Sequence, residues 1–428
     1  MPTLNIGMLG CGNVGAEVAR LLSTDSGDFA ARAGAELVLT KIAVRDLKKT
    51  RAEINPALFT SDAESVVSDP AISIVIEVMG GINPARELLL KAMKNGKSVV
   101  TANKALLAKH GAELFDAATE YGVDLYYEAS VGGAIPILRP LRESIVGDHV
   151  TRIMGIVNGT TNYILTKMDE EGLPFDSVLK EAQALGYAEA DPTADVAGHD
   201  AAAKAAILAS LAFHSRVADS DVYCQGITEI SATDVSVAKA IDHVIKLLAI
   251  AELTTDGKIS VRVHPTLIPR SHPLAAVRNA FNAVFVEAES AGELMFYGRG
   301  AGGEPTASAI LGDVIAVARH KSGGSVGPRE SGYAEREIAP IGDVKTRYLI
   351  RLNVADKPGV LAAIAQIFAS QNVSIQTVRQ AGRGSEAELI VATHAASDSA
   401  LSATVKELSG NSSVKNVESV LRIEGVVN

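Results

Sequence analysis

The sequence predicts an α/β protein built from three structural parts. Apolar strands alternate with helices over the first 130 residues. After about residue 130 the pattern changes to separated strands with long alanine-rich helices between them. From residue 347 to the end, the order is strand, helix, strand, strand, helix, strand. These patterns predict an N-terminal parallel sheet covered by helices, an α+β middle domain and a small α+β domain at the C-terminus.

The elements of the first part follow one another regularly. The strands are apolar on both faces, which is typical of a parallel sheet covered by helices on both sides. Residues 1–130 are therefore expected to form one domain, which a segment near residues 298–320 completes. We expect strands at Leu4–Leu9, Leu37–Val44, Ile72–Val78, Ser98–Ala102 and Val123–Glu128, and helices at Asn13–Leu22, Pro84–Lys94 and Lys104–Tyr121.

The second domain is expected to cover residues 131–320, and a linker rich in glycine is expected at residues 321–346. The last domain then covers residues 347–428. In the second domain we expect strands at Thr151–Val157, Ile259–Val263, Val284–Glu289 and Leu294–Tyr297, and helices at Ala197–Phe213 and Val235–Leu253.

The composition excludes several classes of protein. The chain has 428 residues, of which 47% are hydrophobic and 21% charged, as in ordinary globular domains. The net charge of −10 argues against nucleic acid or an anionic membrane as a partner. No apolar run reaches the ~20 residues that a membrane span needs. With two cysteines and no secretory signal pattern, the chain is expected to be cytoplasmic and without a disulfide framework.

A glycine-rich motif lies between the first expected strand and the first expected helix. Its residues are Gly10, Cys11, Gly12, Asn13, Val14 and Gly15. The first glycine permits a tight turn, the second lets the backbone approach a pyrophosphate, and the third allows the helix to pack on the strand. The amides at the helix N-terminus then face the anion. The motif predicts a Rossmann-type dinucleotide-binding domain, and a glycine-rich turn without a ligand is the less favoured alternative.

The end of the second strand bears on the choice of cofactor. Glu36 is at the spacing of the acidic residue that holds the ribose 2′-hydroxyl of NAD, but it precedes the strand. The strand ends at Arg45 and Asp46, with Lys48 and Lys49 next to them. Arg45 is suited to a 2′-phosphate, so NADP is favoured. NAD remains an alternative because of Asp46, and a solvated surface role is the other interpretation of Arg45.

The most informative polar residues lie in and before an otherwise apolar helix. Asp200 and Lys204 are four residues apart, so both project from one face. Charges in a helix of this kind are costly unless they meet partners or a polar cavity. Glu189, Asp191 and Asp195 add three carboxylates just upstream. One lysine converging with several acids suits a small zwitterionic substrate, whereas an exposed salt bridge of ~0.3–0.5 kcal/mol is the simpler alternative.

This segment, residues 186–204, resembles the signature of homoserine dehydrogenases. The resemblance extends along nearly the whole chain and includes four further motifs, at residues 101–104, 128–136, 158–165 and 297–302. It implies NAD(P)-dependent interconversion of L-aspartate 4-semialdehyde and L-homoserine, in threonine, methionine and isoleucine biosynthesis. The domain at residues 131–320 would then be the catalytic and dimerisation domain, and the protein a homodimer or homotetramer.

The resemblance also implies roles for individual residues. Lys204 would exchange a proton with the substrate oxygen, and Lys104 would lie near the nicotinamide and the substrate. Glu189, Asp195 and Asp200 would bind homoserine. Further cofactor contacts would come from three glycines, namely Gly80, Gly186 and Gly302. A monovalent cation such as sodium would be held by Glu128 and by the backbone carbonyls of Val131, Gly133 and Ile135, although a Gly-Gly turn after a strand is often only a turn.

The last domain resembles an ACT domain with a ferredoxin-like fold. The resemblance rests on residues 356–361, Asp-Lys-Pro-Gly-Val-Leu, between the first strand and the first helix. Such domains bind small amino acids near the turn that contains Gly359, so the resemblance implies feedback regulation by threonine. An ACT domain that has lost its ligand and only dimerises is the alternative. We expect deletion of residues 343–428 to leave catalysis largely intact.

Two other functions fit the residues less well. Aspartate-semialdehyde dehydrogenase requires a thiolate nucleophile. Cys11 belongs to the glycine motif and Cys224 has no activating histidine motif around it. A non-catalytic amino-acid sensor would be expected to lack the charged cluster, yet Lys104, Glu189 and Lys204 are all present.

Overall fold

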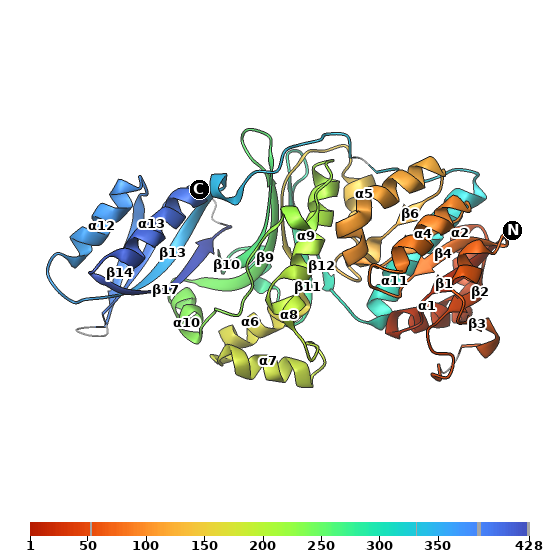
Figure 1. The fold of residues 1–428 in the computed structure, drawn as a ribbon, viewed down its shortest axis with the longest axis horizontal. Coiled ribbons are helices and arrows are strands. Elements are labelled where there is room, and N and C mark those ends of the chain that lie inside the picture. The colour runs from red at the N-terminus through yellow and green to blue at the C-terminus, as the bar shows by residue number, and fades with distance from the viewer. Residues whose placement is uncertain (52–53, 331, 383–386, 426–428) are drawn as a thin grey trace. The chain divides into compact units, whose positions relative to one another are not determined.

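We describe a computed structural model that defines residues 1–51, 54–330, 332–382 and 387–425 (Figure 1). The chain divides into two compact units, and neither is a continuous segment. Unit 1 comprises Met1–Val157, Ala203–Asp221 and Phe281–Glu335. Unit 2 comprises Asn158–Ala202, Val222–Ala280 and Arg336–Asn428.

The N-terminal sheet of unit 1 is parallel throughout, with the strand order β3-β2-β1-β4-β5-β6. Every strand predicted for this part is present, although β6 is shorter than expected. Between the first helix and the second strand the chain forms a further helix, α2, that was not predicted from the sequence. The elements are β1 (Thr3–Leu9), α1 (Asn13–Thr24), α2 (Ser26–Ala33), β2 (Glu36–Ala43), β3 (Phe59–Thr60), α3 (Glu64–Ser68), β4 (Ile72–Glu77), α4 (Ala85–Lys94), β5 (Ser98–Thr101), α5 (Lys104–Glu120) and β6 (Leu125–Tyr126).

Both faces of this sheet are covered, as its apolar strands require. Ile6 and Met8 of β1 join a core with α1 and with α11 (Gly303–Ser322), a helix from much later in the chain. Gly7 lies between them and faces the other side, where an added Cβ would come within 2.5 Å of Val66 in α3. The late helix therefore completes the hydrophobic core of the N-terminal sheet (Figure 1).

The rest of unit 1 contains three antiparallel strands, β7 (Val150–Ile156), β11 (Phe281–Ala288) and β12 (Gly292–Arg299). The expected linker begins inside α11, which continues to Ser322. The chain beyond α11 is packed rather than free. The Gly327 amide donates to Asp124 at 2.7 Å, and the Ala334 amide donates to the carbonyl of His214 at 2.8 Å.

Unit 2 contains a long antiparallel pair, β9 (His243–Leu253) and β10 (Ile259–Pro269), with β8 (Tyr223–Cys224) parallel to β10. Its helices are α6 (Gly159–Glu171), α7 (Phe175–Ala184), α8 (Thr193–Val196) and α10 (Ala232–Ala240). α9 (His199–Ala212) begins in unit 2 and ends in unit 1.

The predicted helix Val235–Leu253 is wrong. α10 ends at Ala240, Asp242 has a left-handed φ of 58°, and the next eleven residues form β9. Most of β9 is buried on both faces, so its sequence lacks the polar alternation that marks a half-buried strand. A short, continuously apolar run cannot be distinguished from a buried helix by periodicity. Pairing with β10 along the whole strand decides the outcome.

The C-terminal part of unit 2 has the predicted order of elements. They are β13 (Lys345–Val354), α12 (Val360–Ser370), β14 (Ile375–Ala381), β15 (Glu388–Thr393), a short β16 (Ala396–Ser397), α13 (Asp398–Gly410) and β17 (Val414–Ile423). The four long strands are antiparallel in the order β17-β13-β15-β14, and both helices pack on them around one core. This is the expected ferredoxin-like arrangement.

The C-terminal part is joined to β10 by backbone pairing and by buried charges. β17 runs parallel to β10, with Thr266 opposite Arg422. Arg262 of β10 is 1% exposed and pairs with Glu252 at 2.7 Å and with Glu424 at 2.9 Å. Deleting the C-terminal part would remove Glu424 and uncover β10, so the expectation of a cleanly removable domain does not fit this junction.

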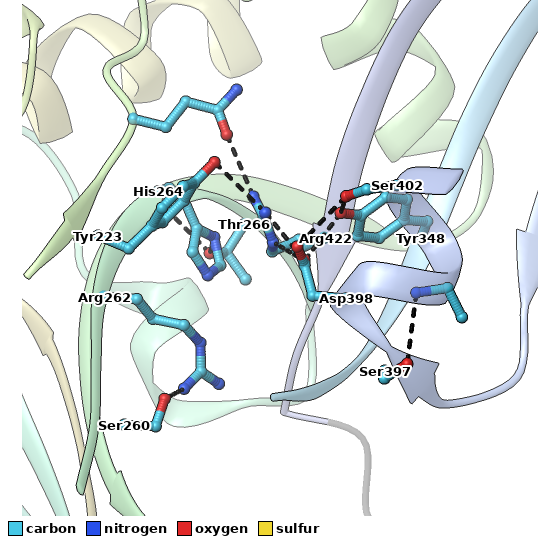
Figure 2. A network of polar contacts seen from close by, with 12 residues as sticks. Tyr223, Ser260, Arg262, His264, Thr266, Tyr348, Ser397, Asp398, Ser402 and Arg422 are labelled. Carbon is cyan, nitrogen blue, oxygen red and sulfur yellow. Dashed lines mark hydrogen bonds and ion pairs between the residues drawn. The ribbon is translucent and has the colours of Figure 1, made fainter. Parts of the chain in front are cut away.

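A second group of polar residues lies at the same junction (Figure 2). The Arg422 guanidinium is 2.9 Å from the Asp398 carboxylate and lies over the rings of Tyr223 and Tyr348. Tyr348 donates its hydroxyl to the same carboxylate at 2.8 Å. Nearby, His264 is fully buried, and burial holds its pKa well below the usual value, so the ring is neutral.

Candidate functional site

The glycine motif lines the largest cavity that we describe in unit 1, of about 530 Å³. Gly10 has a φ of 99°, and a Cβ there would lie 2.8 Å from the backbone of Val78. Gly12 lines the cavity and has no atom within 4 Å of a Cβ position. Asn13, Val14 and Gly15 begin α1, and a Cβ on Gly15 would lie 2.8 Å from the Gly10 carbonyl. Gly10 and Gly15 therefore have no room for a side chain, whereas Gly12 leaves open space into which a pyrophosphate can come.

Three cations lie on the wall of this cavity. Arg45 and Lys49 line the cavity and are exposed. Sequence reasoning missed Arg51, which donates to the Cys11 carbonyl at 3.1 Å and so holds a positive charge beside the glycine motif. Asp46 also lines the cavity, and one of its carboxylate oxygens accepts from the Lys48 amide at 2.8 Å. The wall is therefore suited to an additional phosphate.

A buried carboxylate that sequence reasoning also missed supports the opposite side of the cavity. Glu77, at the end of β4, accepts from the amides of Met79 and Gly80 at 2.9 and 3.1 Å, and from the Thr101 hydroxyl at 2.6 Å. It holds the left-handed turn at Gly80, whose φ is 69°. A polar residue at the end of a parallel strand could have indicated this role, but the strand was predicted to end at Val78, one residue after Glu77.

Lys104 is the first residue of α5, and Asn103 caps that helix by accepting from the Leu106 amide at 3.2 Å. The Asn103 side chain also donates to the Gly81 carbonyl at 2.6 Å. The turn at Gly80 and Gly81 and the start of α5 are therefore fixed to each other within unit 1. This brings Lys104 to the same end of the sheet as the cavity.

Lys204 is 8% exposed and comes from α9. Its ammonium donates to the Val157 carbonyl at 2.6 Å, at the end of β7. An ammonium group carries three N–H donors, and Lys204 gives one of them to this backbone oxygen.

The carboxylates of unit 2 do not all lie together. Asp195 of α8 and Asp200 of α9 both accept from the side-chain amide of Asn158, at 2.7 and 2.9 Å. The turn between the two helices requires Gly198, since its φ is 88° and a Cβ would lie 2.9 Å from the Cys224 sulfur. Asp191 instead accepts from the Thr193 hydroxyl at 2.6 Å, and this bond lowers its pKa.

Glu189 is exposed, and its backbone carbonyl accepts from Gln183 at 3.1 Å. The segment before it is anchored to α6, because Thr160 donates to the Tyr187 carbonyl at 2.6 Å. Gly186 is exposed in a left-handed turn with a φ of 76°. The loop is therefore fixed at its base, while the Glu189 side chain projects into solvent.

Gly302 and the expected cation loop lie in unit 1. Gly302 precedes α11 with a φ of 124°, and the next residue, Gly303, approaches Asn13 of the glycine motif. Val131, Gly133 and Ile135 of this loop are buried. A Cβ on Gly133 would lie 2.5 Å from the Gly300 carbonyl oxygen and would collide with it. Close packing of this loop therefore requires glycine at that point.

The Glu128 carboxylate is held by the backbone next to this loop. Its two oxygens accept from the amides of Ile137, Leu138 and Arg139 at 2.6, 2.8 and 2.7 Å. A cation bound by Glu128 would share these oxygens with the three amides. Within the described ranges, no cluster of three or more His, Cys, Asp or Glu side chains is arranged to hold a metal.

The two cysteines are not nucleophiles of the kind a thioester mechanism needs. Burial raises the pKa of both Cys11 and Cys224, which disfavours the thiolate. Cys224 instead donates to the Ala197 carbonyl at 3.3 Å, beside the Gly198 turn. It packs and fixes the helix that carries Asp200. Among the described residues, no helix is both long and apolar enough to cross a membrane.

Three family models match the chain in succession. The description "homoserine dehydrogenase, NAD binding domain" covers residues 10–128, "homoserine dehydrogenase" covers residues 136–315, and "ACT domain" covers residues 348–410. A homoserine dehydrogenase of Corynebacterium glutamicum is 55% identical over 98% of this chain and 96% of its own length. One from Bacillus subtilis is 42% identical over 99% of both chains.

Solved structures agree with these sequence relatives. The crystal structure of a homoserine dehydrogenase from Thiobacillus denitrificans has a TM-score of 0.95 and 39% identity, covering 99% of this chain and 98% of its own. A hyperthermophilic archaeal homoserine dehydrogenase in complex with NADPH has a TM-score of 0.63 and 28% identity. It covers 74% of this chain and 97% of its own.

Proposed function

Since this chain belongs to the homoserine dehydrogenase family and is an oxidoreductase, we propose that it interconverts L-homoserine and L-aspartate 4-semialdehyde with NADP. The observation that carries this substrate assignment is the pair of carboxylates, Asp195 and Asp200, tied together by one amide. Two fixed carboxylates suit the ammonium group of an amino-acid substrate. The reaction would serve threonine, methionine and isoleucine biosynthesis in the cytoplasm.

Lys204 is the residue that exchanges the proton of the substrate oxygen. Its side chain is nearly buried and held by the Val157 carbonyl. As the ammonium it donates a proton when the aldehyde is reduced, and as the neutral amine it accepts a proton when the alcohol is oxidised. When bound, the nicotinamide supplies or accepts the hydride. Lys104 lies at the start of α5 and would add positive charge near the substrate, and Glu189 would contribute a carboxylate to homoserine binding.

Preference for NADP over NAD rests on the cations of the cavity wall. Arg45 and Lys49 are exposed beside the cavity and could meet a phosphate, whereas Asp46, which also lines the cavity, has one carboxylate oxygen bonded to the Lys48 amide. The archaeal relative was solved with NADPH, which supports the same preference. Gly10, Gly12, Gly80, Gly186 and Gly302 would approach the dinucleotide through their backbones.

One assay tests both substrate and cofactor. Homoserine-dependent reduction of NADP and of NAD is measured separately, for the natural chain and for Arg45→Ala. We expect NADP to be preferred, and Arg45→Ala to raise the KM for NADP about tenfold with little effect on NAD. Lys48→Ala is the control, because Lys48 is exposed but does not line the cavity. Failure to reduce either cofactor with homoserine would overturn the assignment.

We propose that a sodium ion binds at the loop of residues 131–135, mainly through carbonyl oxygens. Val131, Gly133 and Ile135 would provide them, and such oxygens suit a hard monovalent cation. The Glu128 side chain would act as the support that fixes residues 137–139 beside the loop.

Regulation by threonine is the proposed role of the ACT domain. The turn at Gly359 is left-handed, with a φ of 91° and open space around it, which leaves room for a small ligand. β14, the last strand of the sheet, has mostly exposed side chains and would pair with a second subunit in a homodimer or homotetramer.

The threonine proposal is tested by titrating L-threonine into the full chain while following both activity and the thermal unfolding temperature, with L-serine as the control. Inhibition together with stabilisation by L-threonine alone would support it. Absence of both effects would mean that the ACT domain has another ligand or a purely structural role.

A further inference from the structure

Asn158 lies at a point where three separate segments of unit 2 meet. It follows β7, precedes α6, and is 5% exposed. Its side-chain nitrogen donates to Asp195 and to Asp200, at 2.7 and 2.9 Å. Its side-chain oxygen accepts from the Thr161 amide, also at 2.9 Å, and so caps α6.

The orientation of the amide is determined by its four partners. The carboxylates can only accept, so the NH₂ group must face Asp195 and Asp200. On the other side, both the amide and the hydroxyl of Thr161 donate to the Asn158 oxygen, each at 2.9 Å. Only a side chain with two donors and an acceptor in one plane can make all four bonds. Among natural residues, asparagine alone does so at this length.

We propose that Asn158 is a positioning residue that holds Asp195 and Asp200 together as one site for the substrate ammonium. A neutral donor draws the two carboxylates close without cancelling their charge. An arginine or lysine here would neutralise them, and a residue without donors would let them repel each other. This inference rests on the proposed substrate role of the two acids and deepens it, because it explains why they keep a common geometry.

The helix cap provides a way to separate positioning from stability. Asparagine, aspartate and serine are about equally good caps, so a purely structural role predicts similar behaviour for all three residues. The positioning role instead predicts that kcat/KM for homoserine decreases from asparagine to serine to aspartate at position 158. Asn158→Ser keeps the cap and loses the link to the acids, while Asn158→Asp keeps the cap and adds a third carboxylate to the pair.

The test measures kcat and KM for homoserine at several pH values for both variants. We expect kcat/KM to fall about tenfold in Asn158→Ser and further in Asn158→Asp, mainly through KM. In Asn158→Asp the acidic limb of the pH profile should move to higher pH, since a third negative charge favours protonation of the acids. Asn55→Ser, at an exposed cap in unit 1, is the matched control and should leave both constants unchanged.

Thr161→Val provides a second test that keeps the amide itself. It removes the hydroxyl that orients Asn158 but leaves the backbone bond of the cap. A smaller rise in KM is expected, with an unchanged unfolding temperature.

Two results distinguish failure of this inference from failure of the proposed function. Asp195→Asn and Asp200→Asn are measured in parallel. If these variants bind homoserine weakly while the serine and aspartate variants at 158 match the natural chain, Asn158 only caps the helix. If the acid variants bind homoserine normally, the substrate role of the acids is itself wrong.

Discussion

The positive charges of the cofactor cavity and those of unit 2 differ in how they are used. Arg45 and Lys49 are exposed beside the cavity. Arg262, Arg351 and Arg422 are each at least nine-tenths buried and already paired with carboxylates of the same chain. An exposed cation can bind an incoming anion at little cost, whereas a buried pair holds structure together and leaves a costly charge if one partner is lost. Substitutions of the cavity cations should therefore change cofactor binding, and substitutions of these three buried arginines should change stability.

The largest effect on stability is expected at Arg262. Arg262→Met removes the buried cation that pairs with Glu252 and with Glu424, and we expect a loss of about 3–5 kcal/mol in the free energy of unfolding. Denaturant unfolding measures it. The double variant Arg262→Met with Glu424→Gln removes one of the two carboxylate charges and should recover part of the loss. A single variant within about 1 kcal/mol of the natural chain would show that the pair is not needed to dock the ACT domain.

Lys246 should make the stability of unit 2 depend on pH. It is buried, donates to Asn162 at 2.9 Å, and desolvation lowers its pKa to about 8 from 10.5. Between pH 8 and 10.5 Lys246 is protonated in the unfolded chain but not in the folded one, so the free energy of unfolding rises with pH. Below pH 8 both states are protonated, and the full destabilisation from the buried ammonium remains. The rise should amount to about 3 kcal/mol. It is measured as the unfolding free energy at several pH values.

Lys246→Met should flatten this rise, while Lys239→Met, at an exposed position in α10, should leave it as it is. An equal pH dependence in all three proteins would mean that Lys246 is as well solvated in the folded chain as in the unfolded one.

The smallest change in stability is expected at Gly12, where a substitution should alter only the affinity for the cofactor. No atom lies within 4 Å of a Cβ there, so Gly12→Ala should fold as stably as the natural chain. The added methyl group occupies the path of the pyrophosphate and should weaken NADPH binding about tenfold or more. Fluorescence titration measures the affinity. Gly27 has the same open surroundings but lies in α2, so Gly27→Ala should leave the NADPH affinity unchanged. Normal NADPH affinity in Gly12→Ala would contradict the assignment of the glycine loop.

The two regions also differ in how far the sequence predicted them. The glycine motif is one contiguous segment between a strand and a helix, so its position followed from local pattern alone. Arg51 and Glu77 were missed because their roles depend on contacts made by the folded chain. Arg51 donates to the Cys11 carbonyl, and Glu77 accepts from the Gly80 amide in a turn. The local sequence pattern does not predict such contacts.

Unit 2 was harder to predict because its contacts join distant segments. Asp195 and Asp200 were expected to work together, yet their link through Asn158 spans about forty residues of sequence. β9 was predicted as a helix because its burial on both faces hides the strand period. The pairing of Arg262 with Glu424, across 162 positions, has no local signal at all.

The measurement that tests the central claim most directly is the turnover of Lys204→Ala with homoserine and NADP. Loss of the residue that exchanges the substrate proton should lower kcat about 100-fold or more. NADPH affinity, measured by fluorescence titration on the same protein, should stay normal, because Lys204 does not line the cofactor cavity that we describe. A kcat within about threefold of the natural chain would contradict the account, since proton transfer by a positioned side chain contributes far more than that.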